Sequence, residues 1–377
     1  MKKHGAVLVG NGLSVAFNPE LALDAITREV LERMGKADGD DIVAAMREIA
    51  ERTLPEGVTS ADDFEALVGA FGAETRTLGS LGTLADLKSP KDAELRGAIQ
   101  RVAEFAERVR DTGISYVLEV ICERSHATHE ASANLHGLVR DLLATFDGRL
   151  TFGNLNYDTL LLAALMSEGD TGQVADLGDG RRKVEVLVND EETCSVPALR
   201  RTPEDFPSYA RVQLLNLHGS LTYWASPDGT RHAKLKRDLL EDGEQWQAVR
   251  DETTDIRPTV VLANPRDKAQ HVGEYPFSLA YDMFRSGLDR ADHWLIIGYS
   301  FRDFPVNAML REQFEKDAHE PTVLVVTYGD APSRRRIERA FGWDREEDGE
   351  SKGWLTIIRS GANGVQDTTK WQDFTSA

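Results

Sequence analysis

Short runs of consecutive apolar residues alternate along the chain with segments whose apolar residues recur at three- and four-residue steps. The first pattern is typical of buried strands and the second of amphipathic helices. The predicted strands are residues 6–10, 150–152, 183–188, 212–217, 221–224, 259–262, 294–297, 322–327 and 354–358. Strands that are apolar throughout and alternate with helices indicate a parallel sheet covered on both faces. We therefore predict an α/β fold with a Rossmann-like parallel sheet.

A long and almost entirely helical stretch separates the first two predicted strands. Its segments with helical periodicity are residues 21–34, 40–53, 60–71, 94–111, 114–125 and 132–146. We therefore predict a large helical insertion subdomain over residues 19–146, after the first strand. Residues 1–18 and 147–377 would form the Rossmann-like, NAD-binding core with its C-terminal strands.

The remaining segments of the core are predicted from the same periodicities and from the distribution of proline and glycine. Helices are expected at residues 159–166, 233–250, 276–289, 306–314 and 334–341. Three prolines between residues 189 and 209 indicate an irregular excursion, because proline interrupts both helices and central strands. The tail after residue 361 is expected to be weakly ordered.

Composition and charge narrow the classes of function. The chain has 377 residues, 41% of them hydrophobic, and a formal net charge of -19. The hydrophobic content is that of a globular protein with a sizeable core. Phosphate contacts depend largely on clusters of lysine and arginine, so we expect no direct binding to nucleic acid and none to an anionic membrane.

Targeting segments and metal sites are also not predicted. No apolar run reaches the roughly 20 residues of a membrane helix, and the opening residues enter a strand without a cleavage pattern, so we expect a cytoplasmic protein. The chain has two cysteines, which cannot build a four-cysteine zinc module. His126 and His129 lie three residues apart without further ligand groups, and we read them as surface residues. We therefore predict no metal.

Four predicted strands end in glycine-rich or polar turns. These are GNGLS at residues 10–14, NLNYD at 154–158, LHGS at 217–220 and GYSFRD at 298–303. In an open parallel sheet, ligands bind outside the carboxyl ends of the strands. Each turn has a structural alternative, since asparagine, aspartate and glycine favour tight turns and helix caps. The GYS turn is not a hydrolase elbow, because Arg302 stands where the second glycine is needed.

Taken together and in this order, the four motifs resemble the sirtuin-like (Sir2-type) NAD-consuming family. In that family a glycine turn, an N-Y-D motif, an L-H-G motif and a late G-Y-S motif follow one another along a Rossmann-type core. The resemblance covers residues 5–18 and 148–330 and leaves out the helical insertion. The missing four-cysteine module makes the chain similar to the bacterial branch of anti-phage defence NADases, which split NAD, the substrate, without a metal.

The resemblance implies roles for individual residues. His218 would be the base, and Asn156 would position water or ribose as the second catalytic residue. The residues that would bind the dinucleotide are Gly10, Asn11, Gly12, Ser14, Asp158, Gly298 and Ser300. For Asp158, capping of the following helix is an open alternative. The chain departs from the family pattern in two places: Asn11 replaces the usual alanine of the glycine turn, and the N-Y-D motif is preceded by Leu155 and the extra segment FGN.

The resemblance also implies a function and partners. It implies an NAD glycohydrolase that acts as the effector of an anti-phage defence system by depleting NAD. The alternatives are a non-catalytic NAD- or ADP-ribose-binding regulatory subunit of a defence complex and an ADP-ribosyl transferase. A homo-oligomer is expected, and a HerA-type ATPase is the partner that the resemblance implies.

Overall fold

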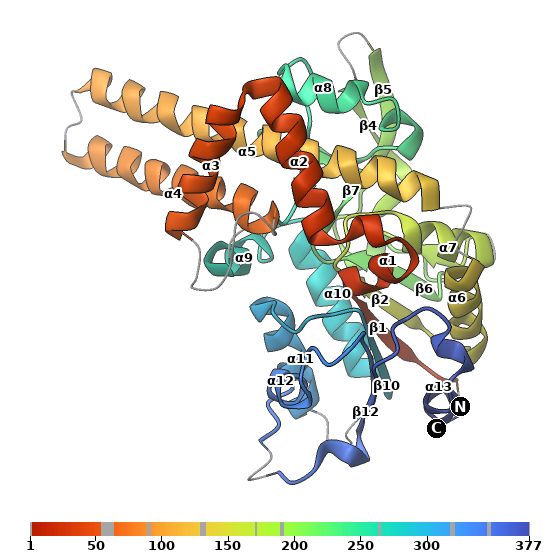
Figure 1. Cartoon of the computed structure of the whole chain (residues 1–377). Helices are drawn as coiled ribbons and strands as arrows, with labels where there is room; N and C mark the ends of the chain where they lie inside the picture. The colour runs from red at the N-terminus through yellow and green to blue at the C-terminus, as the bar shows by residue number, and fades with distance from the viewer. Residues whose placement is uncertain are drawn as a thin grey trace.

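The computed structural model describes nine stretches of the chain. They are residues 2–53, 64–88, 92–128, 133–169, 172–188, 192–262, 265–316, 321–344 and 348–376. Figure 1 shows a central sheet with helices on both sides, from which a pair of long helices, α4 and α5, extends away. Both ends of the drawn chain lie beside each other near α13. None of the helices in these stretches has the length and apolar character of a membrane span.

A seven-stranded parallel sheet forms the centre of the molecule. In spatial order it consists of β12 (Leu355–Ile358), β11 (Thr322–Val326), β10 (His293–Ile297), β1 (Gly5–Val9), β2 (Leu150–Asn154), β6 (Val212–Asn216) and β3 (Val174–Ala175). All neighbouring strands pair in parallel. The first strand of the chain therefore lies in the middle of the sheet, as in a Rossmann-like fold.

Two separate apolar cores cover the two faces of this sheet. On β1, Val7 and Val9 point into one core and Ala6 and Leu8 into the other, because successive side chains of a strand alternate. The first face is covered by α1 (Asn11–Phe17), α6 (Ala133–Thr145), α7 (Leu160–Glu168) and α13 (Thr369–Ser376). The second face is covered by α10 (Phe277–Arg290), α11 (Phe304–Lys316) and α12 (Arg334–Ala340). The predicted fold class is confirmed.

The helical insertion follows the first strand and helix. It contains α2 (Leu23–Asp38), α3 (Asp40–Thr53), α4 (Phe64–Lys88) and α5 (Ala93–Thr128). The prediction of two helices over 94–111 and 114–125 is wrong, because they form the single 36-residue helix α5. Gly113, between them, does not end the helix; a side chain there would come within 3.0 Å of Val68 on α4. The glycine thus allows α4 and α5 to pack closely.

A second, five-stranded sheet was not predicted. Its spatial order is β4 (Gly178–Val188), β5 (Glu192–Leu199), β8 (His232–Lys234), β7 (Gly219–Ala225) and β9 (Arg257–Val260). All of its pairs are antiparallel. The segment predicted as an irregular excursion thus contains β5, in which Pro197 pairs with Lys183 at the end of a register shift. Proline is tolerated at such irregular positions.

Two further expectations about the core are wrong. The helix predicted over 233–250 is only α8 (Glu244–Arg250), and Ala233 and Leu235 are buried with the two-residue period of a strand. The tail after residue 361 is ordered. Its helix α13 is tied to the core by hydrogen bonds from Trp371 to Asp141 and from Lys3 to the Thr375 carbonyl. The remaining short elements are α9 (Pro265–His271), η1 (Pro19–Leu21), η2 (Pro203–Asp205), η3 (Arg237–Leu239), η4 (Ser351–Gly353) and η5 (Val365–Asp367).

A buried histidine at the start of β10 makes the stability of the fold sensitive to acid. The His293 ring packs edge-on against Phe146 and Phe374, and neither ring nitrogen has a hydrogen-bond partner in the described chain. Burial, helped by Lys3, lowers the pKa of His293 to about 4. The unfolded chain therefore takes up a proton near pH 6.5, whereas the folded protein does so only near pH 4.

We expect the free energy of unfolding to be constant with respect to His293 above pH 6.5 and to fall as the pH decreases toward 4. The slope from this histidine would be at most about 1.4 kcal/mol per pH unit. Urea unfolding at several pH values measures it, and His293→Phe should flatten the curve. An unchanged slope in His293→Phe would show that His293 does not cause the loss of stability in acid.

Candidate functional site

The four polar turns come together at one edge of the parallel sheet. In spatial order, β10, β1, β2 and β6 are neighbours, and their last residues are in register. Val9 pairs with Ile297 on one side and with Asn154 on the other, and Asn154 pairs with Asn216. The turns that follow these residues therefore lie next to one another at the carboxyl ends of the strands, where α/β proteins bind ligands.

The glycine turn after β1 packs directly on the turn after β10. The Gly10 and Gly12 N–H groups donate to the carbonyls of Ile297 and Gly298, at 2.9 and 3.0 Å. Gly298 has a φ of +66°, and a Cβ there would lie 2.3 Å from the Leu13 nitrogen. The Asn11 amide donates to the Leu21 carbonyl. The close backbone approach thus accounts for these glycines, and the N–H of Gly12 is used within the protein.

Three of the predicted site residues form one buried hydrogen-bonded chain. The Asn156 Nδ2 donates to the Ser14 hydroxyl at 2.8 Å, and this hydroxyl donates to Asp158 Oδ2 at 2.6 Å. Asp158 Oδ1 accepts from the Leu160 N–H, so the carboxylate both orients Ser14 and stabilises the start of α7. Burial raises the pKa of Asp158 even though Ser14 and the Leu160 N–H oppose the shift.

The amide oxygen of Asn156 is buried and has no hydrogen-bond partner among the described residues. The amide is held in place from behind, because its own N–H donates to Asn154 Oδ1 at 3.2 Å. Asn154 in turn donates to Asn216 Oδ1 on the neighbouring strand at 2.9 Å. A buried acceptor without a partner costs about 1–3 kcal/mol, so this oxygen is suited to accept a hydrogen bond from a ligand.

His218 lies in the adjacent turn and is also buried. Its Nε2 is 3.4 Å from Asp303 Oδ2 and 3.4 Å from the Tyr281 hydroxyl. Burial, followed by the positive charge of Lys268, lowers the pKa of His218 to about 4, against the opposing effect of Asp303. The imidazole is therefore neutral at physiological pH, which is the form that can accept a proton.

A buried ion pair continues from His218 towards the helical insertion. The Lys268 Nζ lies 2.8 Å from Asp303 Oδ2 and 3.5 Å from Glu65 Oε2. Burial alone lowers the pKa of Lys268, but Glu65 and Asp303 outweigh it and raise the pKa. Burial likewise would raise the pKa of Asp303, but His218 and Lys268 hold it below its usual value.

Four residues beside His218 were not identified from the sequence. Asp303 is the last residue of the GYSFRD motif, which follows β10. Its position in a polar turn at the carboxyl end of a strand could have marked it as a site residue. The other three are Glu65, Lys268 and Tyr281, which lie on α4, α9 and α10. Glu65 and Tyr281 occupy ordinary positions in predicted helices, and the helix that carries Lys268 was not predicted, so only the tertiary structure brings these residues towards His218.

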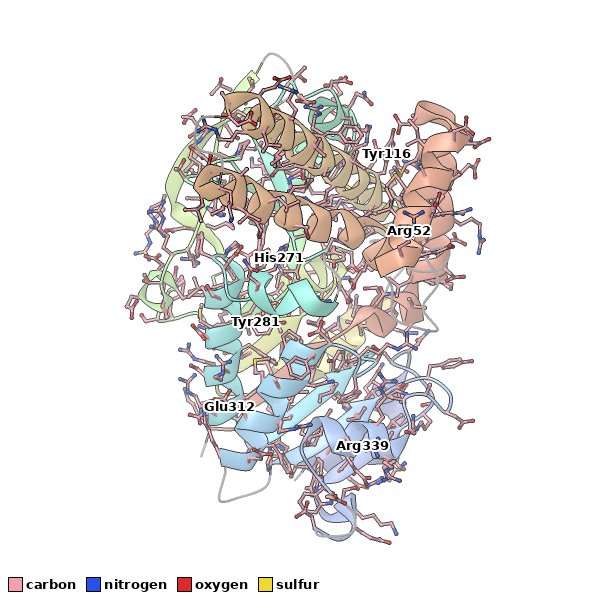
Figure 2. The ribbon with its side chains drawn as sticks, turned by 90° about the vertical axis from the view of Figure 1, so that its left-hand side faces the viewer. Arg52, Tyr116, His271, Tyr281, Glu312 and Arg339 are labelled. Atoms are coloured by element: carbon pink, nitrogen blue, oxygen red, sulfur yellow. The ribbon has the colours of Figure 1, made fainter. Side chains whose placement is uncertain are left out.

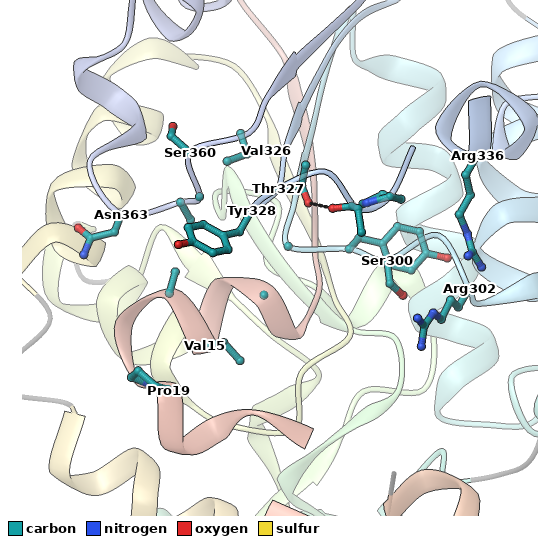
Figure 3. Close-up of a pocket in the computed structure, with 18 residues that line it drawn as sticks. Val15, Pro19, Ser300, Arg302, Val326, Thr327, Tyr328, Arg336, Ser360 and Asn363 are labelled. Carbon is teal, nitrogen blue, oxygen red and sulfur yellow. Dashed lines mark hydrogen bonds between the residues drawn. The ribbon is translucent and has the colours of Figure 1, made fainter. Parts of the chain in front are cut away.

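A cavity of about 540 Å³ borders the glycine turn and the helix α1 that follows it. Figure 3 shows Ser300, Arg302 and Arg336 on one side of it and Tyr328, Ser360 and Asn363 on the other. Of the residues predicted to bind the dinucleotide, Gly12, Gly298 and Ser300 line it, whereas Gly10, Asn11, Ser14 and Asp158 do not. No aspartate or glutamate is among the described residues of its wall.

The turn that carries Ser300 has an unusual backbone. Phe301 has a φ of +55°, a region that L-residues with a Cβ rarely occupy. Its ring packs 4.7 Å from that of Tyr299, and its carbonyl accepts hydrogen bonds from Asn307 and Arg336, both at 3.2 Å. The core and these bonds hold the turn in place, which is how strained residues persist at functional sites.

The described chain contains no cluster of three or more histidine, cysteine, aspartate or glutamate side chains suited to hold a metal ion. Cys122 is a buried free thiol whose pKa burial raises to about 11. His126 lies 2.9 Å from Glu241, and His129 lies outside the described residues.

Comparison with known proteins gives one family-model match, which includes three of the four motifs. A family model described as the SIR2-like domain matches residues 151–344. No curated protein sequence matches the chain significantly.

Three solved structures are similar to the chain at a low level. The first comes from work on the mechanism and regulation of Sir2 enzymes and is 11% identical to this chain. The match covers 100% of this chain and 92% of the chain in that structure, with a TM-score of 0.40. A SIR2 in complex with the inhibitor EX-527, 2'-O-acetyl-ADP-ribose and a deacetylated p53 peptide is 13% identical, with coverages of 62% and 70% and a TM-score of 0.31. A structure on sirtuin substrate affinity is 11% identical, with coverages of 63% and 70% and a TM-score of 0.30.

Proposed function

Because this chain belongs to the SIR2-like family, whose family model covers slightly more than half of it, we propose that it is an NAD glycohydrolase. The reaction splits NAD⁺ and water into ADP-ribose, nicotinamide and a proton. Asn156 and His218 would be the catalytic residues. The proposal combines the family membership with the chemistry of the residues at the carboxyl edge of the sheet.

The observation that carries the proposal is the unpartnered oxygen of Asn156. It is buried at a turn adjacent to that of His218, since the strands before the two turns are paired at Asn154 and Asn216. A ribose hydroxyl or a water molecule donates the hydrogen bond that this oxygen lacks. The neutral imidazole of His218 is the nearby group that can accept a proton.

The types of residue at the site suit cleavage of the bond between the ribose and nicotinamide. The bond from the ribose C1' to the pyridinium nitrogen breaks with its electron pair going to nicotinamide, which leaves as a neutral molecule. No general acid is therefore required for the leaving group. The transition state resembles an oxocarbenium ion, as in glycoside hydrolysis. Water forms the new bond to C1' and passes its proton to His218, while Asn156 orients the ribose or the water.

The cavity on the other side of the glycine turn is suited to the adenosine end of the dinucleotide. Arg302 and Arg336 supply positive charge in a chain of net charge -19, and no acidic residue is found in the described wall. Gly12 and Gly298 form part of the cavity wall, and neither has a side chain that would reduce the space for a ligand. NAD would span the two places with its diphosphate near this glycine contact.

The experiment that tests the function is incubation of the purified chain with NAD and separation of the products. Stoichiometric nicotinamide and free ADP-ribose support the glycohydrolase. Nicotinamide release with ADP-ribose on protein would identify an ADP-ribosyl transferase. Saturable NAD binding without turnover, also with the physiological partner present, would identify a binding module and overturn the proposal.

We further propose a biological role from the resemblance to anti-phage defence NADases. The chain would act as the effector of an anti-phage defence system by depleting NAD, as part of a homo-oligomer and together with a HerA-type ATPase. Cells that carry the chain and a HerA-type neighbour should lose NAD after phage infection. Cells with His218→Ala in the same context should keep their NAD, and equal loss in both would contradict this role.

The exposed ring of Tyr328 offers a test of where the adenosine end binds. The ring lines the cavity and is 83% exposed, so an adenine can stack on it. Stacking of aromatic rings contributes about 0.5–1.5 kcal/mol. Tyr328→Ala is therefore expected to raise the KM for NAD roughly 2- to 12-fold with little change in kcat. Tyr209→Ala, which removes an exposed ring outside the cavity, is the control. An unchanged KM in Tyr328→Ala would place adenosine elsewhere.

A further inference from the structure

His218 lies at the end of a row of charged side chains that is buried at Asp303 and Lys268 and partly exposed at Glu65, where it reaches the helical insertion. The row consists of Asp303, Lys268 and Glu65. We propose that Asp303 and Lys268 are positioning residues for His218, and that Glu65 joins them to the insertion, so that the placement of α4 governs the catalytic histidine. The inference rests on the proposed function for the role of His218, and it adds three residues and a regulatory connection to it.

Asp303 orients the imidazole. A neutral imidazole carries one N–H, and the nitrogen that faces Asp303 Oδ2 at 3.4 Å is Nε2. The carboxylate favours the proton on this nitrogen, which leaves the lone pair on Nδ1. His218 would therefore accept a proton through Nδ1. The Tyr281 hydroxyl, also 3.4 Å from Nε2, is compatible with this tautomer because a hydroxyl oxygen can accept.

Lys268 compensates the charge of Asp303. A single buried carboxylate beside His218 would favour the imidazolium, which cannot act as a base. The Lys268 ammonium lies 2.8 Å from the same carboxylate oxygen and is itself buried. The pair keeps Asp303 ionised for orientation while its field at the imidazole is largely cancelled. Both charges are needed, because removal of one leaves the other buried without compensation.

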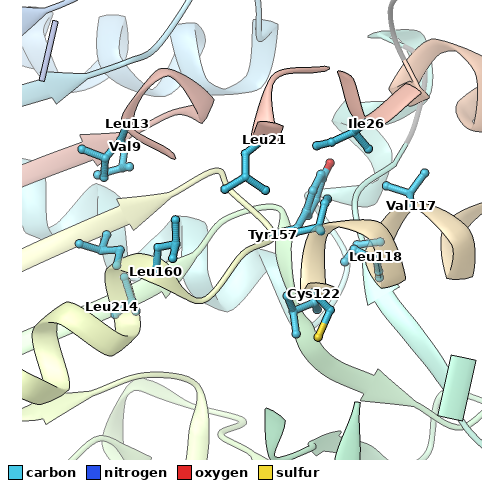
Figure 4. Packing of buried hydrophobic residues seen from close by; sticks show 14 of the residues in the cluster. Val9, Leu13, Leu21, Ile26, Val117, Leu118, Cys122, Tyr157, Leu160 and Leu214 are labelled. Carbon is cyan, nitrogen blue, oxygen red and sulfur yellow. The ribbon is translucent and has the colours of Figure 1, made fainter. Parts of the chain in front are cut away.

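Glu65 connects this arrangement to the insertion. It lies on α4, with one carboxylate oxygen 3.5 Å from Lys268 and the other accepting from the Tyr157 hydroxyl at 2.9 Å. Figure 4 shows the ring of Tyr157, which follows Asn156, among Leu21, Ile26, Val117 and Leu118. In Figure 2, α9, marked by His271, lies between the insertion helices and α10, marked by Tyr281. A shift of α4 would therefore move Glu65, one of the two carboxylate partners of Lys268.

The experiment follows the titration of His218 by NMR of the full chain labelled at histidine. The resonance is assigned by its loss in His218→Gln. The groups that face His218 are Asp303 on the turn before α11, Lys268 on α9, Glu65 on α4 and Tyr281 on α10. Lys268→Met removes the cation that lies between the carboxylates of Asp303 and Glu65. We expect the pKa of His218 to rise by at least about one unit.

Second substitutions in the Lys268→Met variant separate the contributions of Asp303 and Glu65 to the pKa of His218. Lys268→Met with Asp303→Asn, and Lys268→Met with Glu65→Gln, should each bring the pKa back towards the wild-type value, the first pair further than the second. Lys316→Met, which removes an exposed cation on α11, is the control and should change nothing. Lys268→Gln replaces Lys268→Met where the methionine variant does not fold. The acid limb of kcat/KM for NAD should move with the NMR titration.

The outcomes separate this inference from the function on which it rests. A pKa of His218 within about 0.3 unit of wild type in Lys268→Met would refute the role of Lys268. A full return with Asp303→Asn and none with Glu65→Gln would refute the connection to the insertion. The titration does not use NAD, so a wild-type protein that fails to cleave NAD refutes the proposed function without affecting this measurement.

Discussion

Replacement of Asn156 or His218 by alanine is expected to reduce NAD cleavage by at least ~10²-fold, the loss typical of a positioned catalytic group. Asn156→Ala removes the amide oxygen that has no partner in the described chain, together with the hydrogen bond to Ser14. His218→Ala removes the base. Because both would act in one step, the double variant should be little slower than either single variant.

Initial rates, thermal melting and oligomer size measured together test this expectation. Both residues lie in turns beyond the strands, so their loss should affect folding less than that of a core side chain, for which Leu215→Ala is the comparison. His126→Ala, at an exposed histidine, is the activity control. Near-normal turnover in Asn156→Ala and His218→Ala would place the chemistry elsewhere. Loss of folding in both would give the two residues a purely structural role.

A methyl group at Gly298 is expected to have the second large effect, on stability as well as on activity. The Cβ of Gly298→Ala would lie 2.3 Å from the Leu13 nitrogen and 2.5 Å from the Gly12 carbonyl carbon. These are backbone atoms, so no side chain can move away. With the additional cost of a φ of +66°, the free energy of unfolding should fall by about 2–5 kcal/mol. NAD cleavage should fall as well, because the glycine turn separates from the turn after β10.

Gly329 provides a matched control for this variant. It has the same φ of +66°, but a Cβ there has nothing within 4 Å. Gly329→Ala therefore measures the cost of the backbone conformation alone, and the difference between the two variants measures the contact between the turns. Denaturant unfolding and NAD turnover are the readouts. Equal destabilisation in both variants would show that the contact between Gly298 and the glycine turn contributes nothing.

The core strands were predictable because their burial leaves a strong local signal. Strands β1, β10 and β11 are apolar at nearly every position, and each is followed by a turn with glycine or asparagine. A parallel sheet covered on both faces produces this pattern directly. The order of the motifs then indicated the family, and the family model covers residues 151–344, which include the last three of the four motifs.

The second sheet was not predictable as a unit, although the strands predicted at 183–188, 221–224 and 259–262 overlap β4, β7 and β9, because β5 and β8 and the first part of β4 lack this signal. Strand β4 alternates buried with exposed positions and contains several charges, and β5 contains a proline. In antiparallel strands with one face towards solvent, apolar and polar residues alternate, so the sequence contains no continuous apolar run. The single helix predicted over 233–250 is wrong because a run of charged residues does not distinguish an exposed helix from the strand end, 3-10 turn and short helix α8 that are present there.

The sequence by itself therefore determined the parallel core, the presence of a helical insertion and the four turns in which Gly12, Asn156, His218 and Ser300 lie. These features depend on local periodicity and on residues close together in the chain. The tertiary structure alone decided which side chains surround the candidate base. Asp303, Lys268 and Glu65 come from segments up to 238 residues apart, and no local pattern encodes contacts between them. Their meeting at His218 depends on how α4 and α9 pack against the sheet, which is a property of the assembled core.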